Sequence, residues 1–231
     1  MALIEAIADH PEEQMDAIVV DEGQDFTDQW WHAIDWLLRD GDEGTLYIFY
    51  DDNQRIYRQR SKLPKGLVRA ALTRNLRNTK PIFALGQTFY GGGEVLCSGP
   101  EGRPPELVEA TNDQSRLKAL SRVLHHLIRE EGVAPNDICV LTGRRVAASC
   151  VGQADHVGAF AIAVGNQPGV DRVLLETVRR FKGLERPVIV LIEIDDINDS
   201  DEVMYVGVTR ARLHLIVIAK LEVLKPLAAP R

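Results

Sequence analysis

Short apolar runs alternate with amphipathic stretches along this 231-residue chain. The runs are rich in Val, Ile and Leu without a polar residue at every second position, which is typical of strands buried on both faces of a sheet. We expect strands at residues 17–21, 45–50, 68–72, 138–141, 173–176, 188–194 and 213–219. Strands of this kind, separated by helices, predict an α/β fold with a parallel sheet flanked by helices.

The stretches between these runs carry apolar residues at helical spacing. We expect helices at residues 27–39, 79–90, 114–131 and 201–211. In the first helix Trp30 and Trp31 share a register with Leu38, so both tryptophans are expected to pack in the interior. Glycine and proline cluster at residues 91–105, and glycines recur at residues 151–169, so both segments are predicted to be loops.

A domain boundary is expected at residues 61–66, where Ser, Lys, Pro and Gly come together. It divides the chain into residues 1–66 and residues 67–231. The second part is long enough for a domain with its own core, whereas the first part is short.

Composition and charge narrow the class of protein only a little. The net charge is −7 and the pI about 5.4, so no global basic field attracts nucleic acid, although a local groove can still bind a strand. Cys97, Cys139 and Cys150 lie far apart and match no zinc spacing. Their small number suits a reduced compartment, where no disulfide framework is expected. The apolar runs are shorter than a membrane span, and the N-terminal residues do not form a signal peptide. We therefore expect a soluble, cytoplasmic protein with no membrane association.

The most informative segment is the acidic stretch at residues 21–25, directly after the first expected strand. Ligand sites in α/β sheets lie at the carboxyl ends of strands. Asp21 there could hold Mg²⁺ through its water shell, and Glu22 could orient or deprotonate an attacking water. A metal-dependent nuclease using Asp21, Glu22 and Asp25 is a competing interpretation, as is a solvated acidic turn before a helix.

Several other polar segments are weak signals when taken alone. The next expected strand leads into residues 50–58, which contain the amide Gln54. Segments that contain arginines follow at residues 75–77, 176–185 and 204–212. A basic turn at residues 142–145 could contact backbone phosphates or could be an exposed turn. Isolated arginines are usually solvated surface groups.

Taken together and in order, these segments resemble successive motifs of the UvrD/Rep branch of superfamily 1 DNA helicases. Residues 21–25 resemble motif II, and residues 51–60 resemble motif III. Residues 72–77 are similar to motif IV, residues 177–185 to motif V and residues 205–210 to motif VI. The resemblance covers nearly the whole chain. It implies a RecA-like parallel sheet, with the remnant of a first motor domain in residues 1–66 and a second motor domain in residues 67–231.

The resemblance also implies roles in ATP hydrolysis. Asp21 would be the carboxylate associated with Mg²⁺, Glu22 the residue that activates water, and Gln54 the sensor of the γ-phosphate. Arg77 and Arg210 would be the paired arginines that the second motor domain presents to the γ-phosphate. As a pair awaiting a triphosphate, they are expected to face a common surface and to be exposed and unpaired.

Further roles concern the nucleotide sugar and the DNA strand. Glu185 matches the family residue near the ribose, while Tyr57, Arg60 and Thr177 fall where the family contacts single-stranded or partly duplex DNA.

Three positions depart from the family pattern. Leu76 replaces the aromatic residue that stacks on adenine, Gln59 replaces a base-stacking tryptophan, and Arg179 replaces the usual histidine of motif V. The loss of two aromatic platforms weakens base stacking.

The sequence contains no Gly-Lys pair and therefore no phosphate-binding (Walker A) loop. We expect the chain alone to be inactive as an ATPase and to need a missing N-terminal motor segment as its partner, as in a truncated protein or a split gene. The alternative is a natural, non-catalytic motor half that acts as a nucleic-acid or protein binding module.

Overall fold

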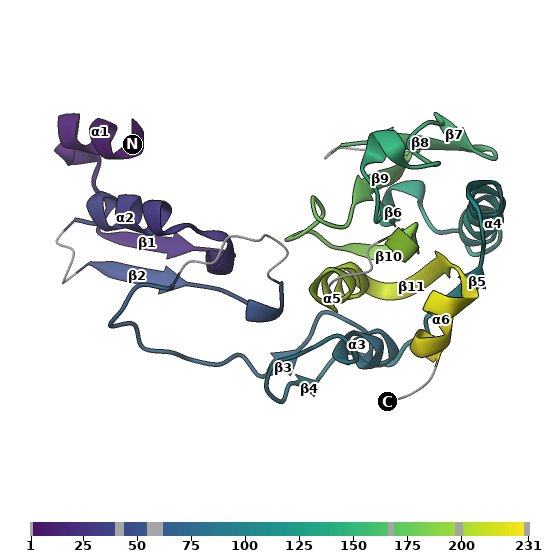
Figure 1. Ribbon diagram of the computed structural model, residues 1–231, viewed down its shortest axis with the longest axis horizontal. Coiled ribbons are helices and arrows are strands. Elements are labelled where there is room, and N and C mark those ends of the chain that lie inside the picture. The colour runs from purple at the N-terminus through teal and green to yellow at the C-terminus, as the bar shows by residue number, and fades with distance from the viewer. Residues whose placement is uncertain (1, 40–43, 55–61, 166–168, 197–200, 229–231) are drawn as a thin grey trace. The chain divides into compact units, whose positions relative to one another are not determined.

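The computed structural model describes residues 2–39, 44–54, 62–165, 169–196 and 201–228. The chain divides into two compact units, Met1–Leu72 and Thr73–Arg231 (Figure 1). The division therefore lies a few residues beyond the expected boundary at residue 66. Among the described residues, no helix combines the length and the apolar character that crossing a membrane requires.

The first unit is a small α/β layer. Its elements are α1 (Ala2–Asp9), β1 (Ala17–Val20), α2 (Asp28–Leu37) and β2 (Thr45–Ile48), with 3-10 turns at Pro11–Glu13, Gly23–Asp25 and Asp52–Gln54. Strands β1 and β2 pair in parallel, with Val20 opposite Ile48. Helix α2 begins after Thr27, whose hydroxyl accepts a hydrogen bond from the Trp30 amide at the helix start.

Only one face of this two-stranded sheet is covered in the described residues. Side chains of α1, α2 and β1 form a small core that contains Ile7, Val20, Trp31 and Leu38. On the other face Val19, Tyr47 and Phe49 are 64%, 61% and 52% exposed. The sheet therefore presents an apolar surface of the kind that a further layer normally covers.

The expectation that both tryptophans pack in the interior was wrong for Trp30. Trp31 is buried, but Trp30 is 55% exposed. Phe26 contacts both rings, at 4.7 Å for Trp31 and 5.3 Å for Trp30, but successive residues of a helix point about 100° apart, so only Trp31 faces the sheet. One ring is thus enclosed while its neighbour lies on the outer side of α2.

The second unit is built on a sheet of seven strands in the order β5-β11-β10-β6-β9-β8-β7. The bounds are β5 Glu106–Glu109, β6 Ile138–Thr142, β7 His156–Val157, β8 Phe160–Val164, β9 Val173–Thr177, β10 Arg186–Ile192 and β11 Ala211–Ala219. Neighbouring strands are parallel except for β7, which runs antiparallel to β8. A separate parallel pair joins β3 (Arg74–Asn75) to β4 (Leu96–Cys97).

Helices cover both faces of this sheet (Figure 1). On one face α4 (Asp113–His125), continued by a π-helical turn at His126–Glu130, packs its leucines against alternate residues of the central strands. On the other face lie α3 (Lys80–Gln87) and α5 (Asp201–Thr209), and α6 (Leu221–Ala228) follows β11. Gly207 lets α5 approach the sheet closely, because a Cβ there would lie 3.2 Å from Leu191. The α/β class with a mostly parallel, helix-flanked sheet is confirmed.

One predicted strand was wrong and several were missed. Residues 68–72 form no strand, and Val68 and Leu72 are 98% and 83% exposed because no neighbouring strand pairs with this run. Within the segments predicted as loops, the structure has β4, β7 and β8. Short strands next to glycines lack the long apolar run that identifies the central ones.

Candidate functional site

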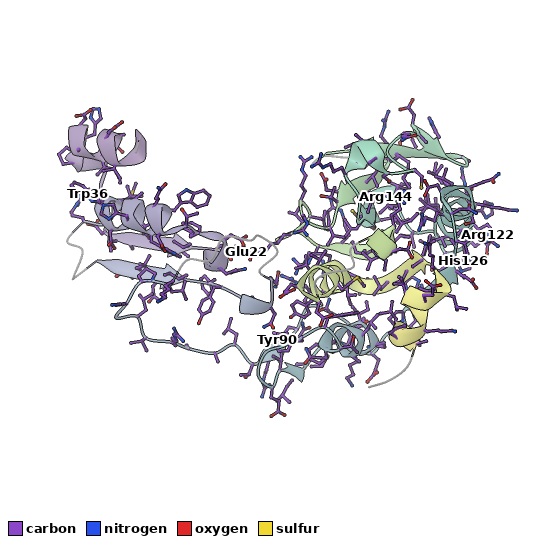
Figure 2. The ribbon with its side chains drawn as sticks, in the orientation of Figure 1. Glu22, Trp36, Tyr90, Arg122, His126 and Arg144 are labelled. Carbon is purple, nitrogen blue, oxygen red and sulfur yellow. The ribbon has the colours of Figure 1, made fainter. Side chains whose placement is uncertain are left out.

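The acidic turn after β1 has an unusual backbone. Glu22 adopts the left-handed conformation, with φ 54°, and its amide donates to Asp21 Oδ1 at 2.9 Å. The next residue must be small, because a Cβ on Gly23 would lie 2.4 Å from Ile48 Cγ2. Strained non-glycine residues occur preferentially at functional sites. Figure 2 marks Glu22 beyond the carboxyl end of β1.

The turns that follow β1 and β2 are hydrogen-bonded to each other. The Gly23 amide donates to the Phe49 carbonyl at 2.9 Å, and the Asp51 amide donates to Gln24 Oε1 at 3.0 Å. Gln54 in turn donates from its Nε2 to Asp51 Oδ2 at 2.9 Å. The structure thus brings Asp21, Glu22 and Gln54 to the same edge of a parallel strand pair, as expected. Gln24, only 3% exposed, makes this link, and its position inside the acidic motif was the available signal for it.

The Asp21 carboxylate fits the expected Mg²⁺ role. It is exposed at the end of a strand and carries the hard oxygen donors that Mg²⁺ prefers. Two of the expected strand-contacting residues, Tyr57 and Arg60, and the substituted position Gln59, lie outside the described residues.

In the second unit a single carboxylate joins residues from distant parts of the chain. Glu185, just before β10, accepts Arg77 Nε at 2.7 Å and lies 3.4 Å from Arg212 Nε in β11. The side chains of Glu185 and Arg77 are 38% and 41% exposed, so the group lies on an accessible rim. Arg212 was not among the expected site residues, although it stands in the same basic cluster as Arg210.

Arg210 contradicts the expectation of two exposed, unpaired arginines. It is 1% exposed, and its guanidinium donates to the carbonyls of Val206 at 3.1 Å and Leu184 at 3.3 Å, and to the Thr209 hydroxyl at 3.2 Å. The carbonyls at the end of α5 carry partial negative charge that offsets the cation. Arg77 is likewise paired, with Glu185. Arg77 contacts Glu185 and Arg210 contacts the adjacent Leu184, so the two arginines lie near each other. Because Arg210 is buried, they do not form a common exposed surface.

A second group of polar residues lies at the carboxyl ends of β6, β9 and β10. Thr177 ends β9, and its amide donates to Glu176 Oε1 at 2.8 Å while its hydroxyl accepts the Arg180 amide at 3.1 Å. After β10 the buried Glu193 adopts φ 56° and accepts the Thr142 hydroxyl at 2.6 Å. Glu193 also accepts Arg144 Nη1 at 3.1 Å, which fixes the basic turn after β6.

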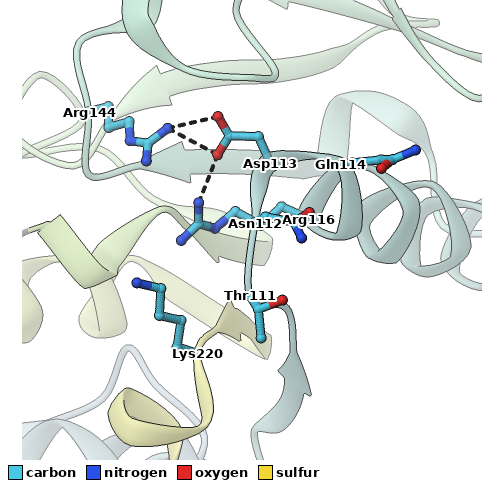
Figure 3. A pocket seen from close by; sticks show the side chains of 7 residues that line it. All are labelled: Thr111, Asn112, Asp113, Gln114, Arg116, Arg144 and Lys220. Carbon is cyan, nitrogen blue, oxygen red and sulfur yellow. Dashed lines mark hydrogen bonds and ion pairs between the residues drawn. The ribbon is translucent and has the colours of Figure 1, made fainter.

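Next to Arg144 is an open hollow of about 550 Å³ lined by Thr111, Asn112, Asp113, Gln114, Arg116, Arg144 and Lys220 (Figure 3). Asp113 lies between two arginines, 2.8 Å from Arg116 Nη1 and 3.1 Å from Arg144 Nη1. Burial opposes ionisation, but hydrogen bonds from Arg116 and Arg144 lower the pKa of Asp113 below its ordinary value. Carboxylates of the protein itself therefore offset the charge of Arg144 in the basic turn at residues 142–145.

Asp113, Cys150 and Glu193 bring potential metal-ligand atoms within 4.8 Å of one another. Burial and the charge of Glu193 raise the pKa of the Cys150 thiol to about 12. The thiol is therefore protonated at neutral pH, and arginines already bind both carboxylates. This donor set does not suit a cation.

The second unit is thus an α/β domain that gathers charged side chains at strand ends, as ligand-binding sheets do. Residues 172–218 match the family model of the UvrD-like helicase C-terminal domain. The matched segment contains Thr177, Glu185 and Arg210, so the resemblance to the C-terminal part of UvrD-type helicases is confirmed over these residues.

Comparisons with curated proteins and with solved structures give less information on the family than this match. No curated protein matches the chain. Among solved structures the chain is similar to the crystal structure of the C-terminal domain of a possible DNA helicase from Lactobacillus plantarum WCFS1. The identity is 15% and the TM-score 0.48, over 63% of this chain and 87% of that one.

Proposed function

We propose that the chain is part of an ATP-dependent DNA helicase or translocase. Residues 1–66 form the end of a first RecA-like motor domain, and residues 67–231 form the second. The chain supplies the Mg²⁺-associated carboxylate, the γ-phosphate sensor and the arginines, and the phosphate-binding loop comes from another segment.

The observation that carries this proposal is the group around Glu185. Arg77 lies 2.7 Å from Glu185, and Arg210 donates to the carbonyl of the preceding residue, Leu184. These residues belong to three motifs that are far apart in the sequence. Binding of one nucleotide by all three motifs would explain why they lie together. Arg77, now paired with Glu185, would bind the phosphate oxygens of ATP, and Glu185 would then be available to the ribose.

In the first unit, the turns after β1 and β2 would act on the phosphates of ATP. Asp21 would hold Mg²⁺, which would supply positive charge to the phosphates. Glu22 orients the attacking water. Gln54 senses the γ-phosphate, and its hydrogen bond to Asp51 connects it to Gln24 and so to the turn that carries Glu22.

The DNA strand would cross the carboxyl ends of the sheet strands. Thr177 offers a hydroxyl there, and Tyr57 and Arg60 are proposed as further contacts. The acidic net charge of −7 makes a local contact surface, rather than a general basic field, the expected mode of binding.

The test supplies the missing loop by fusing the phosphate-binding segment of a UvrD-type helicase ahead of residue 1. ATP hydrolysis stimulated by single-stranded DNA is then measured. Arg77→Ala and Arg210→Ala should each lower turnover on the order of a hundredfold or more, as loss of an arginine finger does. The chain without the added segment should hydrolyse no more ATP than its Glu22→Gln variant.

Arg103→Ala is the matched control, because Arg103 forms a bidentate pair with Glu131 elsewhere in the second unit. It should leave turnover near that of the parent fusion. Near-parental rates in both Arg77→Ala and Arg210→Ala would contradict the proposal.

A non-catalytic binding module is the second candidate, favoured by the pairing of both arginines within the chain. Arg210 has carbonyl and hydroxyl acceptors, and Arg77 has Glu185. The two candidates differ in one combination of results. Binding of labelled oligo(dT) to the chain, together with no effect of either arginine substitution in the fusion, would identify a module.

A further inference from the structure

Asn78 joins two segments that lie far apart in the sequence. It follows β3, precedes α3 and is fully buried. Its side-chain Nδ2 donates to the carbonyl of Thr209 at 3.0 Å and to the carbonyl of Ala211 at 2.7 Å. These carbonyls belong to the residues on either side of Arg210. One amide group therefore ties down the chain on both sides of that arginine.

The orientation of the Asn78 amide is fixed by its chemistry. Carbonyl oxygens only accept hydrogen bonds, so the NH₂ group must face Thr209 and Ala211. The Asn78 side-chain oxygen accepts Asn75 Nδ2 at 3.0 Å, and the backbone amide of Asn78 donates to Asn75 Oδ1 at 3.1 Å. This reciprocal pair of hydrogen bonds fixes the Asn78 side chain in the orientation in which it contacts the segment around Arg210.

Further hydrogen bonds hold the segments next to this contact. The Thr79 amide donates to the Arg212 carbonyl at 3.2 Å, and the Arg186 amide donates to the Arg210 carbonyl at 3.1 Å. The turn between α5 and β11 is thereby fixed from two sides, and the direction in which the Arg210 side chain leaves it is fixed as well.

We propose that Asn78 is a positioning residue for Arg210. Its two donated hydrogen bonds set the backbone of the α5–β11 turn, so that the guanidinium reaches the carbonyls of Val206 and Leu184. The value of this for ATP hydrolysis rests on the proposed function, but the positioning itself can be tested on the chain as it stands.

The test follows hydrogen exchange of the Arg210 Nε–H group by NMR in the ¹⁵N-labelled chain, with its signal assigned by its loss in Arg210→Lys. This group is buried and donates to Val206, so its exchange is slow in the parent protein. Asn78→Ala and the isosteric Asn78→Asp, which cannot donate, should each speed that exchange tenfold or more, roughly the effect of one lost protecting contact. Asn78→Ser, which retains one donor, should have an intermediate effect.

Asn112→Ala is the matched control, because it also removes an asparagine, but one whose side chain accepts the backbone amide of Ser115 at the start of α4. It should leave Arg210 exchange unchanged. Unchanged exchange in folded Asn78→Asp or Asn78→Ser, or equal acceleration in Asn112→Ala, would overturn the proposal.

In the fusion that carries a phosphate-binding loop, Asn78→Ser should lower kcat for ATP hydrolysis with little change in KM, since a displaced arginine acts mainly in the transition state. Altered Arg210 exchange with unaltered kcat would leave the positioning role intact and count against the proposed function. Unaltered exchange would overturn the positioning role whatever the kinetics show.

Discussion

Burial changes the acid–base behaviour of His214 in β11. The side chain is 5% exposed, and its Nε2 lies 3.9 Å from Glu106 Oε2. Desolvation, with a further contribution from the nearby Arg103 charge, lowers the pKa of His214 from 6.5 to about 4. The folded protein therefore keeps this imidazole neutral in mildly acidic solution, whereas the unfolded chain protonates it.

This difference predicts a loss of stability in acid. As the pH falls from 6.5 to about 4 the unfolded state takes up the extra proton, so the free energy of unfolding should fall. The full effect is on the order of 3 kcal/mol, since one pKa unit corresponds to about 1.4 kcal/mol. Urea unfolding at several pH values should show this fall in the parent protein and a smaller one in His214→Phe.

His126 provides a control of opposite sign. Its hydrogen bond to Glu130 raises its pKa, so protonated His126 contributes stability at low pH that is lost as the pH rises. His126→Gln should therefore make the acid-side fall steeper. A His214→Phe variant with the same pH dependence as the parent would contradict the assignment to His214.

For single residues, the sequence predicted the position along the strands better than the surroundings of the side chain. Asp21, Glu22 and Gln54 were expected at one sheet edge and lie there, because strand ends follow directly from the apolar pattern. The burial of Arg210 could not be predicted, because its acceptors include backbone carbonyls that no side-chain pattern reveals. The roles of Asp21, Glu22, Gln54 and Arg210 in catalysis stay predictions.

The elements identified best from sequence are the strands with continuous apolar runs. β6, β9 and β10 each have a fully buried central stretch, which matches their uniform Val, Ile and Leu content. β5 was missed because Leu107 and Val108 are its only apolar residues between two glutamates. The run at residues 68–72 was misassigned because its apolar residues have no neighbour to bury them.

The start of α4 gives a prediction at the scale of one element. Asn112 Oδ1 accepts the Ser115 amide at 2.9 Å, while Ser115 Oγ accepts the Asn112 amide at 3.0 Å. Asn112→Ala should lower the free energy of unfolding by about 1 kcal/mol, because the Ser115 amide at the start of α4 loses its acceptor. Urea denaturation measures the change.

Asn112→Ser keeps a side-chain acceptor at the same position and should lose clearly less stability than Asn112→Ala. Equal losses in the two variants would mean that the cap contributes nothing and that packing of the asparagine side chain matters instead.

At the scale of the whole molecule the two units differ in how complete they are. The large core cluster lies in residues 110–218, within the second unit, whereas the first unit has a two-stranded sheet with an open apolar face. We expect residues 73–231 alone to unfold cooperatively near the transition temperature of the full chain. Residues 1–72 alone should show no cooperative transition, because their core is small and one face of their sheet leaves apolar side chains exposed.

Circular dichroism melts of the two pieces and of the full chain check this expectation. Adding a polar residue on the open face, as in Tyr47→Thr, should reduce self-association of the 1–72 piece in sedimentation experiments. A cooperative transition in that piece, or none in residues 73–231, would show that stability is distributed differently.

The strand order has a consequence for how the protein is made. β5 is an edge strand whose neighbour is β11, and β11 is the last strand along the chain. On the ribosome β5 leaves the exit tunnel early and waits, unpaired, while most of the second unit is synthesised. Its exposed amides and carbonyls can meanwhile pair with other nascent chains. Glu106 and Glu109 at the two ends of β5 place charge on that edge, and charged edges resist such pairing.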